Sequence, residues 1–224
     1  MKQLEEKLGY EFKNKELLKN ALTHSSYANE NRAEGIPSNE RLEFLGDSVL
    51  GFVTARHLYD MTPALPEGKM TRVRAELVCE HSLYEVAREL NLGDCLRMGN
   101  GEEKSGGRAR ASILADAVEA VIAAMFLDGG IEPAASFIKR MVLSPESIKA
   151  HHATDYKTEL QELVQQKPGH VLQYKAAGES GPDHDKVFMA EVYLDEKLVG
   201  SGSGRTKKEA EQAAACRALE RLSK

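Results

Sequence analysis

The sequence predicts an α+β protein of two domains, an all-α domain followed by a smaller domain with the order helix, strand, strand, strand, helix. Up to about residue 143, apolar residues recur every three or four positions, which is typical of amphipathic helices. Around residues 144–154 the chain becomes polar, and beyond it apolar and polar residues alternate in KVFMAEVYLD, as in a half-buried strand. We therefore expect an all-α domain at residues 1–146, a linker at 147–153 and the second domain at 154–224.

Four segments of the first domain carry the helical pattern, and glycines and prolines separate them. These segments are ELLKNALTH, RLEFLGDSVLGFVTARHLY, VRAELVCEHSLYEVARELNL and SILADAVEAVIAAMFLDGG. The second segment has an apolar stripe at heptad spacing, which predicts a face packed in the core and comprises Leu42, Leu45, Val49 and Phe52. The fourth segment is apolar nearly all round between Ile113 and Leu127, which predicts a buried helix. Its only charged residues over that range, Asp116 and Glu119, lie one turn apart.

The second domain begins with a short helix in DYKTELQELVQQK, whose apolar residues Leu160, Leu163 and Val164 fall on one side. Three strands are expected next, in VLQYKAAGES, KVFMAEVYLD and KLVGSGSG, with GPDHD as the turn between the first two. The last helix, in TKKEAEQAAACRALERL, opens with Thr206 and Glu209 at the spacing of a capping box.

Composition and motifs exclude several classes of protein. No basic N-terminal segment precedes an apolar run, and no stretch approaches the ~18 apolar residues of a membrane span, so we expect a cytoplasmic protein without a membrane partner. Three cysteines without CxxC spacing and seven histidines without an HExxH pair predict neither a disulfide framework nor a zinc site. GSGSGRTKK lacks the GxxxxGK[ST] pattern of a phosphate-binding loop, so no nucleotide cofactor is predicted.

The stretch NERLEFLGDSVL carries an unusual set of like charges. As a helix it places Glu40, Glu43 and Asp47 along one stripe, where carboxylates repel one another. Together with Asp116 and Glu119 they could form a site of oxygen ligands, which selects Mg²⁺ or Mn²⁺ over zinc. The spacing equally allows buried ion pairs with arginines, for which the candidates are Arg72, Arg74, Arg108 and Arg110.

A second apolar face is expected on the same helix. Phe44 lies roughly opposite the heptad stripe and shares its face with the small residues Ser48, Gly51 and Ala55. Such a face packs against another surface, which is either a second subunit or another core helix. We favour a second subunit.

At this point the motifs are recognisable. NERLEFLGDSVL resembles the signature of bacterial ribonuclease III, and LTHSSY, PEGKMTRVRAELV and GGRARASILADAVEAVIAAMFLDGG continue that pattern. The stretch from DYKTELQELVQQK to KKEAEQAAA resembles a double-stranded RNA-binding domain. The resemblance implies a homodimeric endonuclease that cuts double-stranded RNA with Mg²⁺, or with Mn²⁺ as a substitute. It also implies products with 5′-phosphate and 3′-hydroxyl ends and short 3′ overhangs, and a role in processing ribosomal RNA precursors and structured transcripts.

The same resemblance implies roles for individual acids. Four match the family's catalytic Mg²⁺-binding carboxylates, namely Glu43, Asp47, Asp116 and Glu119. Glu40 and Glu67 match acidic residues that line the cleavage valley near the dimer interface. All six acids are present, so nothing indicates a member that has lost catalysis.

Candidate RNA-binding residues lie in the second domain. The polar face of its first helix suits 2′-hydroxyls and base edges in the minor groove of RNA and comprises Thr158, Gln161, Glu162 and Gln165. Lys207 and Lys208 begin a helix, where the backbone amides also favour an anion such as phosphate. By resemblance, His184 is the minor-groove contact of the loop between the first two strands. From residue 154 onward eleven Lys and Arg stand against twelve Asp and Glu, so RNA must bind a local basic patch.

Two other functions compete with this interpretation. A double-stranded RNA-binding regulatory protein that does not cleave would be favoured by the loss of a catalytic carboxylate, and none is lost. An all-α metal-dependent phosphohydrolase of small nucleotides would not need the helix–strand–strand–strand–helix domain.

Overall fold

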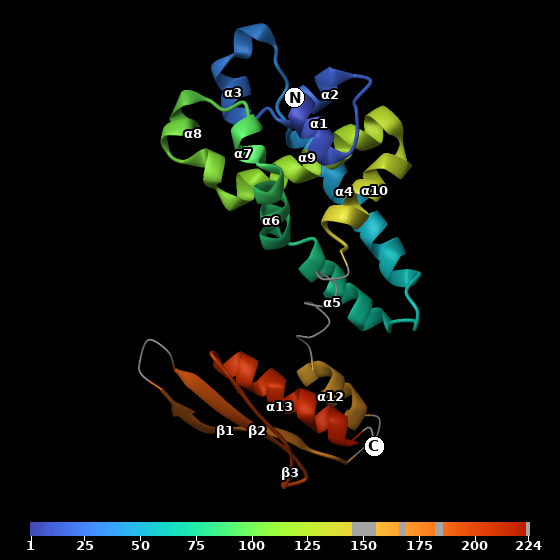
Figure 1. Cartoon of the computed structure of the whole chain (residues 1–224), viewed down its shortest axis with the longest axis vertical. Coiled ribbons are helices and arrows are strands. Elements are labelled where there is room, and N and C mark those ends of the chain that lie inside the picture. Colours follow the sequence, from blue (N-terminus) through green and yellow to red (C-terminus); the bar gives the residue numbers. More distant parts are fainter. Residues whose placement is uncertain (145–155, 166–168, 182–185, 223–224) are drawn as a thin grey trace. The chain divides into compact units, whose positions relative to one another are not determined.

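The computed structural model describes residues 1–144, 156–165, 169–181 and 186–222. The chain forms two compact units, Met1–Lys149 and Ala150–Lys224 (Figure 1). The predicted linker at 147–153 and the loop that contains His184 lie outside the described residues.

The first unit is built from helices, as the sequence predicts. They are α1 (Lys2–Leu8), α2 (Lys15–Ala21), α3 (Ser25–Glu30), η1 (Arg32–Glu34), α4 (Glu40–Tyr59), α5 (Glu67–Leu77), α6 (Glu80–Leu90), α7 (Leu92–Cys95), α8 (Asn100–Lys104), η2 (Gly107–Ala109), α9 (Ala111–Gly129) and α10 (Ile131–Met141). Local signals set several ends: the Asn14 side chain accepts a hydrogen bond from the amide of Glu16 at the start of α2. Gly9 ends α1 in the left-handed conformation, with φ of 67°.

Helix α9 is the central element of this unit. It packs against α2, α4, α6 and α10 (Figure 1), and its side chains are buried on every side from Ile113 to Met125 apart from Asp116 and Glu119. This confirms the prediction that an all-apolar segment forms a buried helix, because only a helix covered all round can bury every face. The two acids are thereby held on a rigid element.

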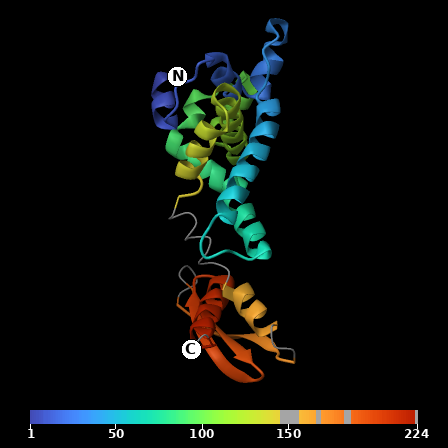
Figure 2. The same ribbon diagram turned by 90° about the vertical axis from the view of Figure 1, so that its right-hand side faces the viewer.

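Helix α4 is long and runs along the outside of the helical unit (Figure 2). Leu42 and Val49 are buried as predicted. The placement of Phe52 on the same buried stripe is wrong, because its side chain is 62% exposed. The buried face of α4 includes Leu50, and Phe52 lies two positions later, ~200° around a helix of 3.6 residues per turn, so it faces away from the core.

The second unit consists of a three-stranded antiparallel sheet with two helices on one face (Figure 1). Its elements are α12 (Tyr156–Gln165), β1 (Leu172–Ser180), β2 (Val187–Leu194), β3 (Lys197–Gly204) and α13 (Lys207–Leu222). Ala190 and Val192 of β2 are buried against the helices, which fixes the register of the alternating strand. The amide of Glu209 donates to the Thr206 hydroxyl at 3.1 Å, as a capping box requires. The predicted element order is confirmed.

None of the helices in the described ranges is long and apolar enough to cross a membrane.

Candidate functional site

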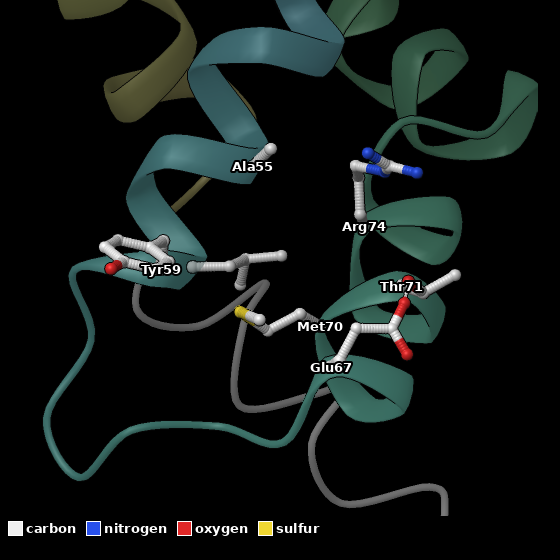
Figure 3. A pocket seen from close by; sticks show the side chains of 7 residues that line it. Ala55, Tyr59, Glu67, Met70, Thr71 and Arg74 are labelled. Carbon is white, nitrogen blue, oxygen red and sulfur yellow. Dashed lines mark hydrogen bonds between the residues drawn. The ribbon is translucent and has the colours of Figure 1, made fainter.

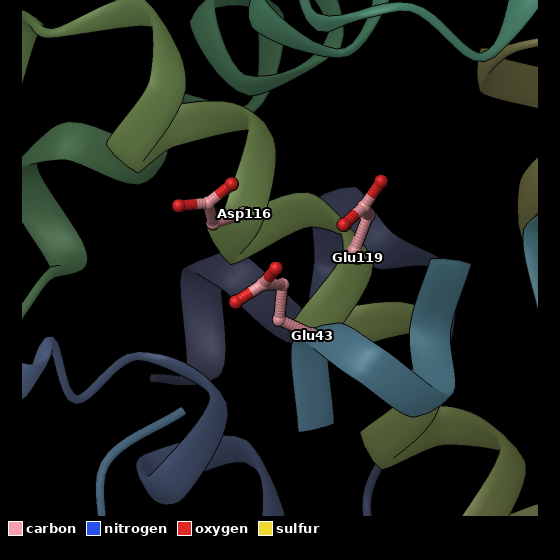
Figure 4. Close-up of side chains that lie close together, drawn as sticks. All are labelled: Glu43, Asp116 and Glu119. Atoms are coloured by element: carbon pink, nitrogen blue, oxygen red, sulfur yellow. The ribbon is translucent and has the colours of Figure 1, made fainter. Parts of the chain in front are cut away.

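Two helices of the first unit bring three carboxylates together. Glu43 comes from α4, and Asp116 and Glu119 come from α9 (Figure 4). One oxygen of each lies within 4.8 Å of the others, and all three side chains are half-buried. Asp47 is one turn further along α4, is exposed and is not part of this group of three. The structure therefore brings three of the four predicted carboxylates together, and Asp47 lies outside this group.

Gly46 is the residue that lets the two helices meet here. A Cβ atom at position 46 would lie 1.9 Å from the backbone oxygen of Glu119, far inside van der Waals contact. Glycine inside a helix weakens it by ~0.5–1 kcal/mol relative to alanine, so its use at this point reflects close backbone approach. Because Gly46 lies between Glu43 and Asp47, the point of closest approach is also the point where the acids of α4 face those of α9.

Burial and mutual repulsion strongly perturb these acids. Burial, followed by the charges of Asp47, Asp116 and Glu43, raises the pKa of Glu119 to about 8. The pKa of Glu43 is raised in the same direction by burial and by its acidic neighbours. Burial, and then the charge of Glu80, raises the pKa of Asp116. The ionised forms of these acids are therefore unfavourable side by side, and a bound cation would stabilise them.

Two of the four candidate arginines form ion pairs with other acids, so they do not neutralise the converging carboxylates. Arg108 binds Glu103 with an N–O distance of 2.6 Å, and Arg110 binds Glu102 at 2.6 Å. Across residues 1–144, no lysine or arginine forms an ion pair with the three converging carboxylates. Three carboxyl groups with no cation paired to them supply the hard oxygen ligands that Mg²⁺ or Mn²⁺ prefers.

The two acids predicted to line a cleavage valley lie in different places. Glu40 accepts a hydrogen bond from the Ser38 hydroxyl at 2.7 Å, and its charge contributes to the raised pKa of Glu43. Glu67 begins α5, where it accepts a hydrogen bond from the Thr71 hydroxyl at 3.0 Å. It lies beside the opposite end of α4, so within one chain the structure does not bring Glu67 to the carboxylates.

A strip of exposed aromatic side chains follows the outer face of α4. Phe44 is 78% exposed, Phe52 62% and Tyr59 73%, and helical spacing places all three on one side. We call these three residues the aromatic face. At its C-terminal end a pocket of about 210 Å³ opens between α4 and α5, and Tyr59 lines it together with Ala55 and Met70 (Figure 3). Of the predicted second face of α4, Phe44 and Ser48 are exposed in a single chain, whereas Gly51 and Ala55 are half-buried.

The second unit presents the predicted polar residues in two groups. On α12, Gln161 and Gln165 are exposed and Thr158 is half-buried. Lys207 and Lys208 are exposed at the first two positions of α13. Glu162 belongs to α12, but its side chain lies outside the described atoms, as does His184.

Sequence reasoning missed two residues of the carboxylate site. Gly46 had a usable signal, since an isolated glycine inside a strong helical pattern indicates close packing. Glu80, which begins α6 and raises the pKa of Asp116, had none, because its approach to α9 depends on how α6 packs.

Comparison with known proteins agrees with this architecture. Residues 14–146 match the family model described as ribonuclease-III-like, and residues 156–222 match the double-stranded RNA binding motif. The chain is 47% identical to ribonuclease 3 of Listeria monocytogenes over 221 residues, which cover 98% of this chain and 96% of the relative. It is 53% identical to ribonuclease 3 of Pelotomaculum thermopropionicum over 218 residues, covering 96% and 90%.

Among solved structures, the nuclease domain of ribonuclease III from Campylobacter jejuni is 44% identical, with a TM-score of 0.58. The match covers 62% of this chain and 94% of that one, and the structure is described as showing flexibility in a region involved in dimer formation. With one family model spanning more than half of the chain and relatives near 50% identity over almost its whole length, this chain belongs to the ribonuclease III family.

Proposed function

We propose that the chain hydrolyses phosphodiester bonds of double-stranded RNA with a divalent metal ion held by the acids of α4 and α9. The observation that carries this proposal is the convergence of Glu43, Asp116 and Glu119 with no cation paired to them among residues 1–144. A ribonuclease III family chain that also carries a double-stranded RNA binding motif has duplex RNA as its substrate. A regulatory protein that only binds RNA would not need this costly cluster of like charges.

The converging carboxylates are the proposed metal ligands, and Asp47 is the fourth acid of the site. Mg²⁺ is the proposed ion, with Mn²⁺ as a substitute, because all available donors are carboxylate oxygens. When bound, the ion supplies an activated water near neutral pH and stabilises charge on the attacking and leaving oxygens. The protein's part is to hold the acids in place: α9 is fixed in the core, and Gly46 keeps α4 against it.

The second unit is proposed to hold the duplex. Gln161, Gln165 and Thr158 offer hydrogen-bonding groups to the minor groove, and Glu162 is assigned to the same contact. His184 is assigned to the minor-groove contact of the loop between β1 and β2. Lys207 and Lys208 are proposed phosphate contacts, because two cations at a helix start are unfavourable without an anion.

The working form is proposed to be a homodimer formed through the aromatic face of α4. Three large aromatic side chains on one exposed helix face mark a surface that a partner covers. The position of Glu67 is a second reason to propose a dimer. Within one chain Glu67 lies at the other end of α4 from Glu43. Glu40 and Glu67 can therefore line one cleavage valley only if a second copy of the chain contributes one of them.

The remaining expectations concern products and setting. We propose 5′-phosphate and 3′-hydroxyl ends with short 3′ overhangs, and ribosomal RNA precursors and structured transcripts as substrates. The cytoplasmic location and the domain limits at 146 and 154 stay predictions.

The proposal is tested with end-labelled duplex RNA incubated with and without Mg²⁺. Wild type is compared with Glu119→Ala and with Glu89→Ala, a matched control at an exposed position of α6. We expect Mg²⁺-dependent cutting in wild type and Glu89→Ala, and binding without cutting in Glu119→Ala. Wild type that binds the duplex but never cuts it in Mg²⁺ or Mn²⁺ would favour the regulatory alternative.

A further inference from the structure

Asn39 is a buried polar residue directly before α4, outside the set of acids. Its side chain is 5% exposed, which is unusual for asparagine and implies that its polar atoms have protein partners. It occupies the position that caps α4, yet its side chain makes no capping hydrogen bond there. Asparagine is among the best capping residues, so the side chain serves another purpose.

That purpose is to bind the end of α2. The Asn39 side-chain amide donates to the backbone oxygen of Ala21 at 3.3 Å, and its backbone amide donates to that of Thr23 at 2.8 Å. The backbone oxygen of Leu22, between them, accepts from the amide of Arg97 at 2.7 Å. Ala21, Leu22 and Thr23 are all buried, so carbonyl groups at this helix end have no water to bind if these donors are lost.

The contacts of Asn39 join both halves of the carboxylate site. On one side its backbone oxygen accepts from the amide of Glu43 at 2.9 Å, which sets the first turn of α4. On the other side α2 packs against α9, which carries Asp116 and Glu119. Asn39 thus ties the start of the helix that bears Glu43 to an element that rests on the helix bearing the other acids.

We propose that Asn39 is a positioning residue, whose side-chain amide holds Glu43 at the correct distance from the two acids of α9. The inference rests on the proposed function, in that it treats these acids as metal ligands. Asn39 itself touches neither metal nor RNA in this proposal. Loss of the Asn39 side-chain amide shifts Glu43 and lowers the affinity of the site for the metal ion.

Two variants separate this role from simple capping. Asn39→Ser keeps a good capping residue but is too short to reach the Ala21 oxygen. Asn39→Asp keeps the shape, but an ionised carboxylate cannot donate to a carbonyl oxygen, so this variant is compared with wild type across a pH series that reaches its ionised form. The added negative charge alone would strengthen cation binding, so weaker binding in Asn39→Asp can only come from lost positioning. Asn31→Ser is the matched control. It removes a hydrogen bond of 2.8 Å from the Asn31 side-chain amide to the backbone oxygen of Tyr27, at a place away from α4.

The primary readout is Mn²⁺ affinity of the full chain without RNA, measured from the free-Mn²⁺ electron paramagnetic resonance signal. We expect the Mn²⁺ dissociation constant to rise in Asn39→Ser and Asn39→Asp and to stay at the wild-type value in Asn31→Ser. In the cleavage assay, misplacement of a ligand by ~1 Å predicts a fall in kcat of about 10- to 100-fold with the KM for RNA unchanged.

The outcomes are distinguishable. Wild-type Mn²⁺ affinity in both folded Asn39 variants would overturn the positioning role while leaving the proposed function intact. Loss of the folded circular dichroism spectrum in both variants would also overturn it, because Asn39 would then hold the domain together rather than one ligand. Wild type that binds Mn²⁺ through Glu119 but cuts no RNA would instead contradict the proposed function.

Discussion

Replacing Gly46 by alanine is the sharpest structural test of how the carboxylate site is built. The new Cβ would lie 1.9 Å from the backbone oxygen of Glu119, whereas ordinary contact begins near 3.4 Å. Helices α4 and α9 must therefore part by about 1.5 Å at this point, since the obstructing atoms belong to backbone and cannot rotate away. This separation of the helices would move Glu43 on α4 away from Glu119 on α9.

Two magnitudes follow from that displacement. Overpacking of a close-packed interior costs about 1–3 kcal/mol, and a backbone clash belongs at the upper end, so we expect the free energy of unfolding to fall by about 3 kcal/mol. For a protein of this size, about 3 kcal/mol lowers Tm by roughly 10 °C. A ligand shift above 1 Å predicts a fall in cleavage rate of about 100-fold and a higher Mg²⁺ requirement.

The assay combines urea unfolding with cleavage of duplex RNA across a Mg²⁺ series, at a temperature where the variant is folded. Gly101→Ala is the matched control, because a Cβ there meets nothing within 4 Å. It should match or slightly exceed wild type in stability and cut at the wild-type rate. If Gly46→Ala is as stable and as active as wild type, the close approach of α4 and α9 is refuted.

Three further predictions concern the acids, the aromatic face and the basic residues. Because the pKa of Glu119 is raised to about 8 from an ordinary 4.5, the folded metal-free protein holds a proton that the unfolded chain has lost. Its Tm should therefore fall as pH rises from about 5 to 8, and Glu119→Gln should reduce that fall; an unchanged pH profile in the variant would contradict the assignment. Phe44→Arg should yield monomers in analytical ultracentrifugation, since a charge is costly at a buried contact, and an unaltered dimer would place the interface elsewhere. Replacing both Lys207 and Lys208 by alanine should weaken RNA binding and reduce the slope of log affinity against log salt by about 2, and an unchanged slope would mean that neither contacts phosphate.

Periodicity was enough to predict the elements that carry the site. The all-apolar segment around Asp116 and Glu119 has one stable solution, a helix buried in the centre, so its role as the rigid half of the site followed from composition. The alternation of apolar and polar residues in β2 and the cap at Thr206 likewise predicted a strand and a helix start in the second unit, because each signal is local. These features depend on neighbours within one turn or one strand.

Features that depend on long-range packing escaped prediction. Phe52 was placed in the core by a heptad count, but the position of α9 against α4 decides which face is covered. The choice between metal and arginine as the partner of the acids also needed the fold, since Arg108 and Arg110 could reach them by sequence but pair with glutamates near their own loop. The bonds of Asn39 to the end of α2 span some eighteen positions and leave no mark in the sequence.

The most direct test of the central claim is an anomalous difference map from crystals grown with Mn²⁺. We predict a peak among the carboxylates of Glu43, Asp116 and Glu119, and its loss in crystals of Glu119→Gln. A map with no peak there at saturating Mn²⁺, or with arginine side chains moved in to pair with the acids, would contradict the account.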